Sequence, residues 1–386
     1  MRNILIWCGF LLIIGTLLRL DRQKKRKKVE GTPLSAFIPC YNDGATIETT
    51  LKSLYASYPH ELLEVFVIND KSTDNSLAIL EKLNQSYPFH LINNKENLGK
   101  SKSLNEIIPS ASHATLLIID ADTKISKANI ADMLKRKVWK VAGVSCPCKP
   151  TNKGFLPLMQ HIEYIMRGFI QGAYNTTSVI GMRGGCIMVD KKAFLEVGSF
   201  SYQAITEDMD LAFKLNKAWY KVEQSLTQIQ TEVPATLKSR WKQRIRRWSW
   251  CFQCFVKYRK IWIKNPLHIF FICYFCVSTG VSVFYFVKDR ILINTIIEAN
   301  QSWTAIFFIL NPKRRLTTIF TKLGFTLFAL PYTIPLIKSR KDLRKIIYII
   351  PFSLVYIPLF FVVNIGGIIS CSTKYRALES GKIRGR

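Results

Sequence analysis

The stretch Ala114-Thr115-Leu116-Leu117-Ile118-Ile119-Asp120-Ala121-Asp122 decides the predicted fold of this chain. Its first six residues form an almost continuous apolar run, which is typical of a strand buried inside a sheet. Two carboxylates, separated by one residue, follow directly where this strand ends. The stretch therefore predicts a central strand that carries acidic groups at its carboxyl end.

The sequence before this stretch alternates between short apolar runs and amphipathic runs. We expect strands at residues 33–39, 63–68, 89–93 and 114–119, and helices at residues 45–57, 76–86 and 100–108. This alternation predicts an α/β fold, in which a parallel or mostly parallel sheet carries helices on both faces. In such folds, ligands collect beyond the carboxyl ends of the strands.

The chain combines a positive mean hydropathy of +0.11 with a formal net charge of +29. A soluble domain rarely shows both, so we expect the apolar residues to be concentrated in blocks. Residues 3–18 are uncharged and precede a basic run at residues 22–28. Because the heavier positive charge follows the apolar block, the sequence favours an uncleaved membrane anchor whose carboxyl side faces the cytoplasm.

Three more apolar blocks are each long enough to span a bilayer, at residues 266–287, 316–337 and 346–371. A weaker block at residues 291–310 is interrupted by Glu298, so it could be a short span or an interfacial or re-entrant piece. Counting the weaker block gives five crossings and leaves the basic tail in the cytoplasm. We therefore expect a multi-pass protein of the cell membrane with a cytoplasmic catalytic domain.

The predicted organisation comprises consecutive regions that differ in charge and hydropathy. They are a transmembrane anchor at 1–20, a basic juxtamembrane linker at 21–32, a catalytic domain at 33–235, amphipathic interface helices at 236–265, a transmembrane region at 266–371 and a basic cytoplasmic tail at 372–386. The basic runs lie beside apolar blocks, which suits anionic lipid head groups. Nucleic acid is not an expected partner, because no basic face of a polar domain is predicted.

Asp120 and Asp122 suit a divalent cation that is bound to a nucleoside diphosphate. Mg²⁺ and Mn²⁺ take oxygen ligands, and alternate side chains of an extended segment point the same way. For an isolated Asp-x-Asp pair a solvated loop is the alternative, but the buried strand before this pair favours binding. After another apolar strand, Asp70 could accept a hydrogen bond from a uracil imide, while residues 71–75 suit a turn and a helix cap.

Further candidate residues lie at expected helix starts. Lys100 follows Gly99, where the ammonium and backbone N–H groups could face phosphate. Asp208 is the candidate general base, a carboxylate that can remove the proton of an attacking hydroxyl. Its neighbours Glu207 and Asp210 can also be explained as ordinary acidity before a helix expected at residues 209–218.

Residues 237–262 are expected to form a helix with apolar and aromatic residues at helical spacing and basic residues between them. This amphipathic pattern suits a helix in the membrane interface. Arg247 could pair with a diphosphate. Trp248 could stack on a sugar ring, or it could serve only as an anchor in the interface.

The order of these signatures from Phe37 to Trp248 resembles the membrane-bound, processive members of glycosyltransferase family 2, which include hyaluronan, chitin, cellulose and poly-N-acetylglucosamine synthases. The resemblance implies a GT-A fold, a UDP-sugar donor, Mg²⁺ or Mn²⁺, and inversion at the anomeric carbon. By match to the family motifs, the implied donor-binding residues are Asp43, Asp70, Lys100, Asp120, Arg247 and Trp248, the implied metal ligand is Asp122, and the implied base is Asp208.

Other segments also bear on the resemblance. Residues 181–186 resemble the family's acceptor-side segment, and residues 161–164 resemble an interfacial helix near it. Asn69 stands where the family commonly has aspartate, and Lys71 stands where glycine is usual. One extra residue separates Gln243 from the tryptophan of the last motif. These departures weigh more against processivity than against sugar transfer.

The sequence thus favours a membrane-bound inverting glycosyltransferase that extends a polysaccharide from UDP-N-acetylglucosamine and couples synthesis to export. The alternative is the transfer of one sugar to a lipid acceptor, which the small set of spans allows. A non-enzymatic protein with this fold is disfavoured by the intact carboxylates Asp120, Asp122 and Asp208. Expected partners are the donor, the polysaccharide or lipid acceptor, membrane lipids and a small accessory membrane subunit.

Overall fold

The computed structural model describes residues 13–18, 20, 31–138, 140–202, 204 and 206–262. The predicted spans at 266–371, most of the predicted anchor and the basic tail lie outside these residues. Among the residues described, none of the helices has the length and apolar character needed to cross a membrane. Residues 14–258 belong to one compact unit, and the short helix α10 (Arg259–Trp262) belongs to another.

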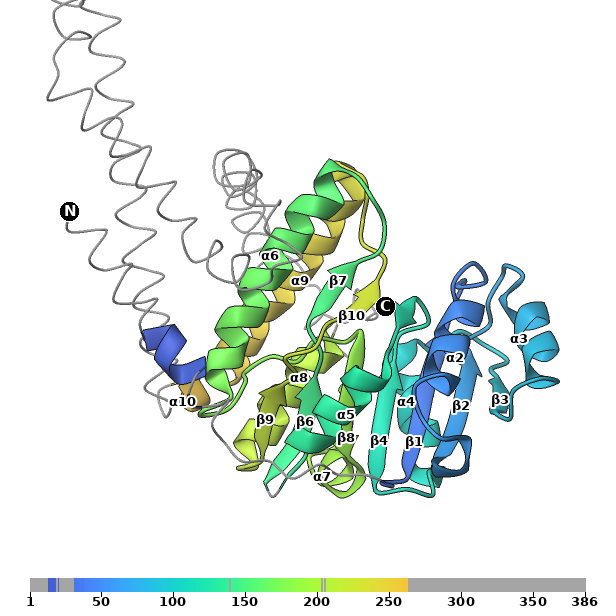
Figure 1. The fold of residues 1–386 in the computed structure, drawn as a ribbon, viewed down its shortest axis with the longest axis horizontal. Helices are drawn as coiled ribbons and strands as arrows, with labels where there is room; N and C mark the ends of the chain where they lie inside the picture. The colour runs from blue at the N-terminus through green and yellow to red at the C-terminus, as the bar shows by residue number, and fades with distance from the viewer. Residues whose placement is uncertain are drawn as a thin grey trace, which may run out of the picture. The chain divides into compact units, whose positions relative to one another are not determined.

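The described part of the chain contains a seven-stranded sheet with the order β3-β2-β1-β4-β8-β6-β9 (Figure 1). Its strands are β1 (Leu34–Cys40), β2 (Leu63–Asn69), β3 (His90–Asn93), β4 (Thr115–Ile119), β6 (Val141–Ser145), β8 (Cys186–Asp190) and β9 (Lys221–Gln224). The strands from β3 to β4 are parallel, as is the pair of β6 and β9. Strand β8 runs antiparallel to both of its neighbours, so the mostly parallel prediction is confirmed and the sheet is mixed.

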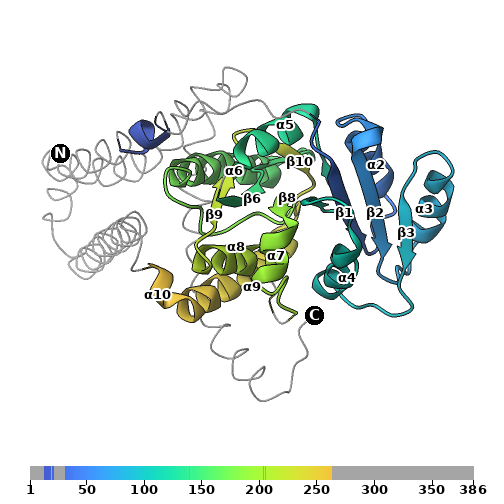
Figure 2. The same ribbon diagram turned by 90° about the horizontal axis from the view of Figure 1, so that it is seen from below.

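Helices cover both faces of this sheet, as Figure 2 shows. On one face lie α2 (Ile47–Tyr55), α3 (Ser76–Asn84) and α5 (Lys127–Arg136), and on the other lie α4 (Lys100–Ile107), α7 (Lys191–Glu196) and α8 (Glu207–Lys217). Side chains of β1 alternate between the two faces. Ala36 and Ile38 belong to the core formed with α2, α3 and α5, whereas Phe37 stacks on Phe66 at a centroid distance of 4.9 Å.

The ends of the predicted elements differ from the observed ends by a few residues. The helix expected at 209–218 begins two residues earlier, at Glu207, so its acidic residues lie inside the first helical turn. The single helix expected at 237–262 is divided at Tyr258, where α9 (Leu237–Lys257) ends before α10 begins. Helix α9 runs alongside α6 (Phe155–Tyr174), as Figure 1 shows.

A second, three-stranded sheet was not predicted from the sequence. In the described residues its order is β5-β10-β7, formed by β5 (Thr123–Lys124), β10 (Ile229–Thr231) and β7 (Cys148–Pro150). Thr123 pairs with Thr231 across the antiparallel β5–β10 ladder. Because β5 directly follows Asp122, this small sheet brings a distant part of the chain to the acidic end of β4.

Candidate active site

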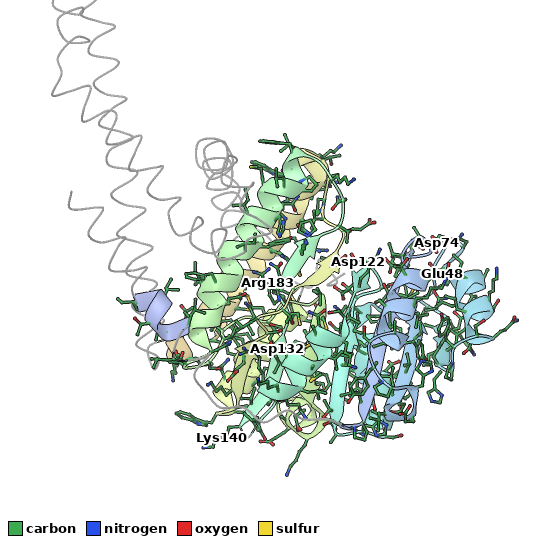
Figure 3. The ribbon with its side chains drawn as sticks, in the orientation of Figure 1. Glu48, Asp74, Asp122, Asp132, Lys140 and Arg183 are labelled. Carbon is green, nitrogen blue, oxygen red and sulfur yellow. The ribbon has the colours of Figure 1, made fainter. Side chains whose placement is uncertain are left out.

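The acidic turn after β4 lies at the carboxyl end of the main sheet. Figure 3 shows Asp122 and Asp74 at this end, whereas Lys140 lies at the opposite end. The turn is fixed by its backbone, since Asp120 N–H donates to the Gly185 carbonyl at 3.1 Å. The Thr50 hydroxyl also donates to the carbonyl of Ala121 at 2.8 Å. The local fold therefore holds the turn at the sheet end where ligands are expected.

Lys100 joins two of the acidic segments. Its Nζ lies 2.6 Å from Asp120 Oδ1 and 2.8 Å from Glu207 Oε1. Burial alone would lower the pKa of Lys100, but the charges of Asp120 and Glu207 outweigh it and raise that pKa above its usual value. Lys100 is thus a fixed cation at the centre of the site, and Glu207 contributes more than acidity at a helix start.

Asp70 is buried and accepts hydrogen bonds from the segment that leads into α4. Its Oδ2 accepts from Gly99 N–H at 2.7 Å, and its Oδ1 accepts from Leu98 N–H at 2.9 Å. The side chains of Asn94 and Ser103 also donate to Oδ1, at 2.8 and 3.0 Å. Gly99 has φ +79°, a left-handed conformation that favours glycine. Asp70 therefore fixes the chain just before Lys100, while its predicted contact with uracil stays a prediction.

Asp122 is partly buried and is oriented by two threonines of the small sheet. The hydroxyls of Thr123 and Thr231 both donate to its Oδ1 at 3.2 Å. Burial and the charge of Asp120 raise the pKa of Asp122 to about 6. A divalent cation would relieve this repulsion between carboxylates. In the described residues no three His, Cys, Asp or Glu side chains gather to hold a metal, so the fit is to a cation that takes protein, phosphate and water oxygens together.

Asp208 is partly buried in the first turn of α8. Burial and the charge of Glu207 raise its pKa to about 6, although Arg247 and Lys100 oppose that rise. A side chain at Gly184 would place its Cβ 3.2 Å from Asp208 Oδ2 and 3.6 Å from Lys100 Nζ. Glycine at 184 therefore leaves space in front of the carboxylate, and this position lies within the predicted acceptor-side segment.

Arg247 and Asp43 complete the predicted set as far as the structure describes it. Burial lowers the pKa of Arg247, but its electrostatic interactions with Tyr164 and with the Asp208 carboxylate raise that pKa above its usual value. Asp43 accepts from Tyr41 N–H at 3.0 Å in the turn after β1, and burial raises its pKa, with the charge of Asp120 adding to the rise. The side chain of Trp248 lies outside the described residues.

The departures from the family pattern have structural counterparts. Lys71 has φ +57°, which explains why glycine is favoured at this position. Asn69 Nδ2 donates to Asn93 Oδ1 at 2.8 Å, so the amide joins the ends of β2 and β3. Asn42 also has a left-handed φ of +59°, and its Oδ1 accepts from Thr73 N–H at 2.7 Å. These contacts tie the loops after β1 and β2 together.

Helix α9 has a buried side that faces α6, and its place in the membrane interface stays a prediction. Trp241 is 37 % exposed, whereas Arg240 and Arg244 are buried. Both arginines form ion pairs with Glu163 on α6. Residues 161–164 were expected near the interface, and here they form part of a buried contact between two helices. The sequence analysis did not identify Thr231. It included Glu163 and Gly184 only within the segments 161–164 and 181–186, without a role for either residue, because their partners are distant along the chain.

The comparisons with known proteins agree with this geometry. Residues 35–198 match the family described as Glycosyl transferase family 2. Over 219 residues the chain is 31 % identical to poly-beta-1,6-N-acetyl-D-glucosamine synthase of Staphylococcus aureus (strain COL), an alignment that covers 55 % of this chain and 53 % of that protein. The synthase of the same name from Staphylococcus epidermidis is 31 % identical over 231 residues, covering 58 % and 55 %. The chain spans about half the length of these curated relatives.

A solved structure shares the fold. The mannosyltransferase PcManGT from Pyrobaculum calidifontis, in complex with GDP-Man and Mn²⁺, superposes with a TM-score of 0.55 at 18 % identity, covering 88 % of this chain and 99 % of that one. The chain therefore has the GT-A fold of glycosyltransferases. Within it, residues 35–198 form a glycosyl transferase family 2 domain.

Proposed function

We propose that this protein is a membrane-bound inverting glycosyltransferase that adds sugar units from UDP-N-acetylglucosamine to a growing polysaccharide and couples synthesis to export. The observation that carries the proposal is the position of Asp208, a carboxylate with a pKa raised to about 6 beside the Lys100–Asp120–Glu207 group. The matched synthases from staphylococci are named for a poly-N-acetylglucosamine product, which supports this donor and this polymer.

The acidic turn is the proposed binding site for a divalent cation, Mg²⁺ or Mn²⁺. Asp122 would ligate the ion, and Asp120 would serve the diphosphate. The bound cation would supply charge neutralisation for the leaving diphosphate. Asp43 and Asp70 complete the donor side, and Lys100 is held where its ammonium can face a phosphate. Mn²⁺ in the mannosyltransferase complex supports the choice of a divalent ion.

In the proposed reaction, Asp208 accepts the proton of the acceptor hydroxyl. The hydroxyl oxygen forms a bond with the anomeric carbon, and the bond from that carbon to the diphosphate oxygen breaks, so the configuration inverts. A pKa of about 6 keeps most Asp208 carboxylates ionised at neutral pH while leaving them basic enough to take the proton. Arg247 would pair with the diphosphate from the α9 side, and Trp248 would provide a surface for the acceptor sugar.

The proposal is tested with purified membranes that are given a panel of labelled UDP-sugars, with product size measured. We expect UDP-N-acetylglucosamine to give long products, in a reaction that needs Mg²⁺ or Mn²⁺. The Asp208→Asn variant is the matched control and should give none above background. A product carrying a single sugar on a lipid would favour the alternative activity, and absence of transfer from every UDP-sugar would contradict the proposal.

A further inference from the structure

Glu163 forms a buried charge centre between the two long helices. It lies on α6 with 3 % of its surface exposed. Arg240 Nη2 on α9 lies 2.8 Å from Glu163 Oε2, and Arg244 Nη2 contacts the same oxygen. On its own helix, Arg167 Nε lies 2.9 Å from Oε1. One carboxylate therefore holds guanidinium groups from both helices.

Charge makes this carboxylate hard to replace. Burial would raise the pKa of Glu163, but the surrounding arginines hold it well below its usual range, so the group stays ionised. Burial and the neighbouring cations Arg244, Arg183 and Arg247 lower the pKa of Arg167 to about 10, against the pull of Glu163. Positive charge is thus concentrated in the contact between α6 and α9. Loss of the carboxylate would leave buried guanidinium groups that repel one another.

The charge centre acts on the part of α9 that precedes Arg247. Residues 240, 244 and 247 are spaced by four and three positions, so they share one side of the helix. Farther along, Asp210 of α8 accepts from Tyr258 Oη at 2.8 Å and from Lys257 Nζ at 2.9 Å. The segment with Arg247 therefore lies between two fixed points, and one of them belongs to the helix that carries Asp208.

We propose that Glu163 is a positioning residue of the transfer reaction. By holding Arg240 and Arg244 against α6, it places Arg247 beside Asp208, where the guanidinium can meet the donor's diphosphate. The inference rests on the proposed function. It assigns a role in this reaction to a carboxylate that touches neither the acidic turn nor Asp208 in any contact described above.

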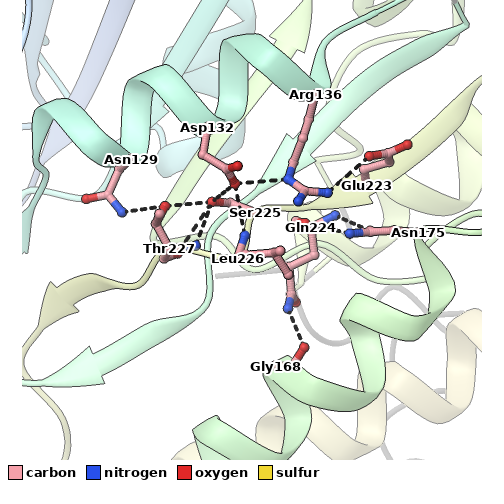
Figure 4. A network of polar contacts seen from close by, with 10 residues as sticks. All are labelled: Asn129, Asp132, Arg136, Gly168, Asn175, Glu223, Gln224, Ser225, Leu226 and Thr227. Atoms are coloured by element: carbon pink, nitrogen blue, oxygen red, sulfur yellow. Dashed lines mark hydrogen bonds and ion pairs between the residues drawn. The ribbon is translucent and has the colours of Figure 1, made fainter. Parts of the chain in front are cut away.

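A role limited to stability is the competing explanation, and a matched control separates the two. Glu223 of β9 is also a buried glutamate within an ion-pair network, with Arg136 Nη1 3.3 Å from its Oε2 (Figure 4). Lys221 Nζ lies 3.2 Å from its other oxygen. Glu223→Gln should lower stability much as Glu163→Gln does, but it leaves α9 and Arg247 in place.

The test is a double-mutant cycle in the full-length protein in membranes. Glu163→Gln should lower kcat by about 10- to 100-fold, since a displacement of about 1 Å in a positioning group has effects of this size. Arg247→Met should give a loss of similar size, and the double variant should be no slower than Arg247→Met alone. Glu223→Gln should keep kcat within about twofold of the parent.

Other measurements keep the test decisive if Glu163→Gln folds poorly. Arg240→Gln removes one guanidinium and should cause a smaller loss of kcat in the same direction, with Glu163→Asp recovering part of the activity. The affinity for UDP can be measured without turnover, so this measurement is informative even if the proposed donor is wrong. Glu163→Gln should weaken UDP binding by the same factor as Arg247→Met. Additive losses in the cycle, or a Glu163→Gln protein that behaves like Glu223→Gln in both assays, would overturn the inference.

Discussion

The two halves of the main sheet place functional groups in different ways. From β3 to β4 the strands are parallel, and the acidic residues follow strand ends directly, as Asp70 follows β2 and Asp120 follows β4. From β8 to β9 the sheet is mixed, and the contacts of the site cross long stretches of chain. Asp122 and Thr231 are separated by 109 positions, and Glu163 and Arg240 by 77. The first half is the half that local sequence patterns describe well.

The difference indicates a division of work. In the proposed reaction the parallel half holds the donor through groups built on rigid strand ends, and Arg247 of α9 adds a contact to the diphosphate. The mixed half supplies Asp208 and the acceptor side. Helix α8 joins the two halves, because Glu207 pairs with Lys100 while Asp208 faces Gly184. A variant in one half should therefore change donor binding or turnover selectively, and this separation can be measured.

The largest expected effect separates turnover from donor binding. Asp208→Asn should lower turnover by ~10²–10⁴-fold, because a positioned base typically contributes that much to the rate. Affinity for the UDP-sugar should stay close to that of the parent, since Asp208 is not among the proposed donor-binding groups. Turnover is measured with labelled donor, and affinity is measured by titration calorimetry.

Near-normal turnover in Asp208→Asn would place the base elsewhere, with Glu207 as the next candidate. Because Glu207 already pairs with Lys100, Glu207→Gln should weaken donor binding as well as slow turnover. A pure loss of turnover in Glu207→Gln, with donor binding unchanged, would therefore exchange the roles of the two residues.

The next effect tests whether the small sheet supports the acidic turn. Thr231→Val removes a hydroxyl that donates to Asp122 Oδ1 but nearly keeps the side-chain volume. Groups that orient metal ligands typically change metal affinity or activity by ~10–100-fold, so Mn²⁺ affinity in the presence of UDP should fall within that range. Thr227→Val is a suitable control, since Thr227 bonds to Asn129 instead. Equal Mn²⁺ affinity in both variants would contradict the assigned role of Thr231.

The sequence could predict the parallel half because each strand there is followed by its own polar residues. Strand β4 and its two aspartates form one continuous signal, and so do β2 and Asp70. The antiparallel β8 and the small sheet have no such signal, since their pairing partners are set by tertiary packing. The buried side of α9 illustrates the same limit. Arginines at helical spacing predict a solvated or interfacial face. The sequence does not show that these arginines pair with Glu163, a buried carboxylate on another helix.

A smaller effect tests the role of Asp70 without altering it. Ser103→Ala removes one donor to Asp70 Oδ1 from a position inside α4. If Asp70 holds the start of α4, the variant should weaken UDP-sugar binding by roughly three- to tenfold, which corresponds to a hydrogen bond worth about 1 kcal/mol. Unchanged binding in Ser103→Ala, together with a large loss in Asp70→Asn, would favour a direct contact between Asp70 and the nucleotide.

The last effect concerns stability instead of binding or turnover. Burial and Glu207 raise the folded-state pKa of Asp208 from its usual value near 4 to about 6. A raised acid pKa means that the folded protein binds the proton of Asp208 more tightly than the unfolded chain does. The stability contributed by protonated Asp208 is therefore present below about pH 4 and is lost as the pH rises to about 6. Above that pH the ionised Asp208 lowers the stability of the parent, and Asp208→Asn removes the cost.

Asp208→Asn should therefore unfold a few degrees higher than the parent at pH 8, for a difference of about 1–2 kcal/mol after allowance for partial exposure, and the gap should close towards pH 4. Thermal unfolding at both pH values is the measurement, and Asp132→Asn is the control. Burial raises the pKa of Asp132, but Arg136 and Ser225 outweigh burial and lower that pKa below its usual value. The net shift is therefore opposite in sign to that of Asp208, and Asp132→Asn should lose stability at pH 8. A lower Tm for Asp208→Asn at pH 8 would show that its neighbours favour the charged form, which would weaken the case for Asp208 as a base poised near neutral pH.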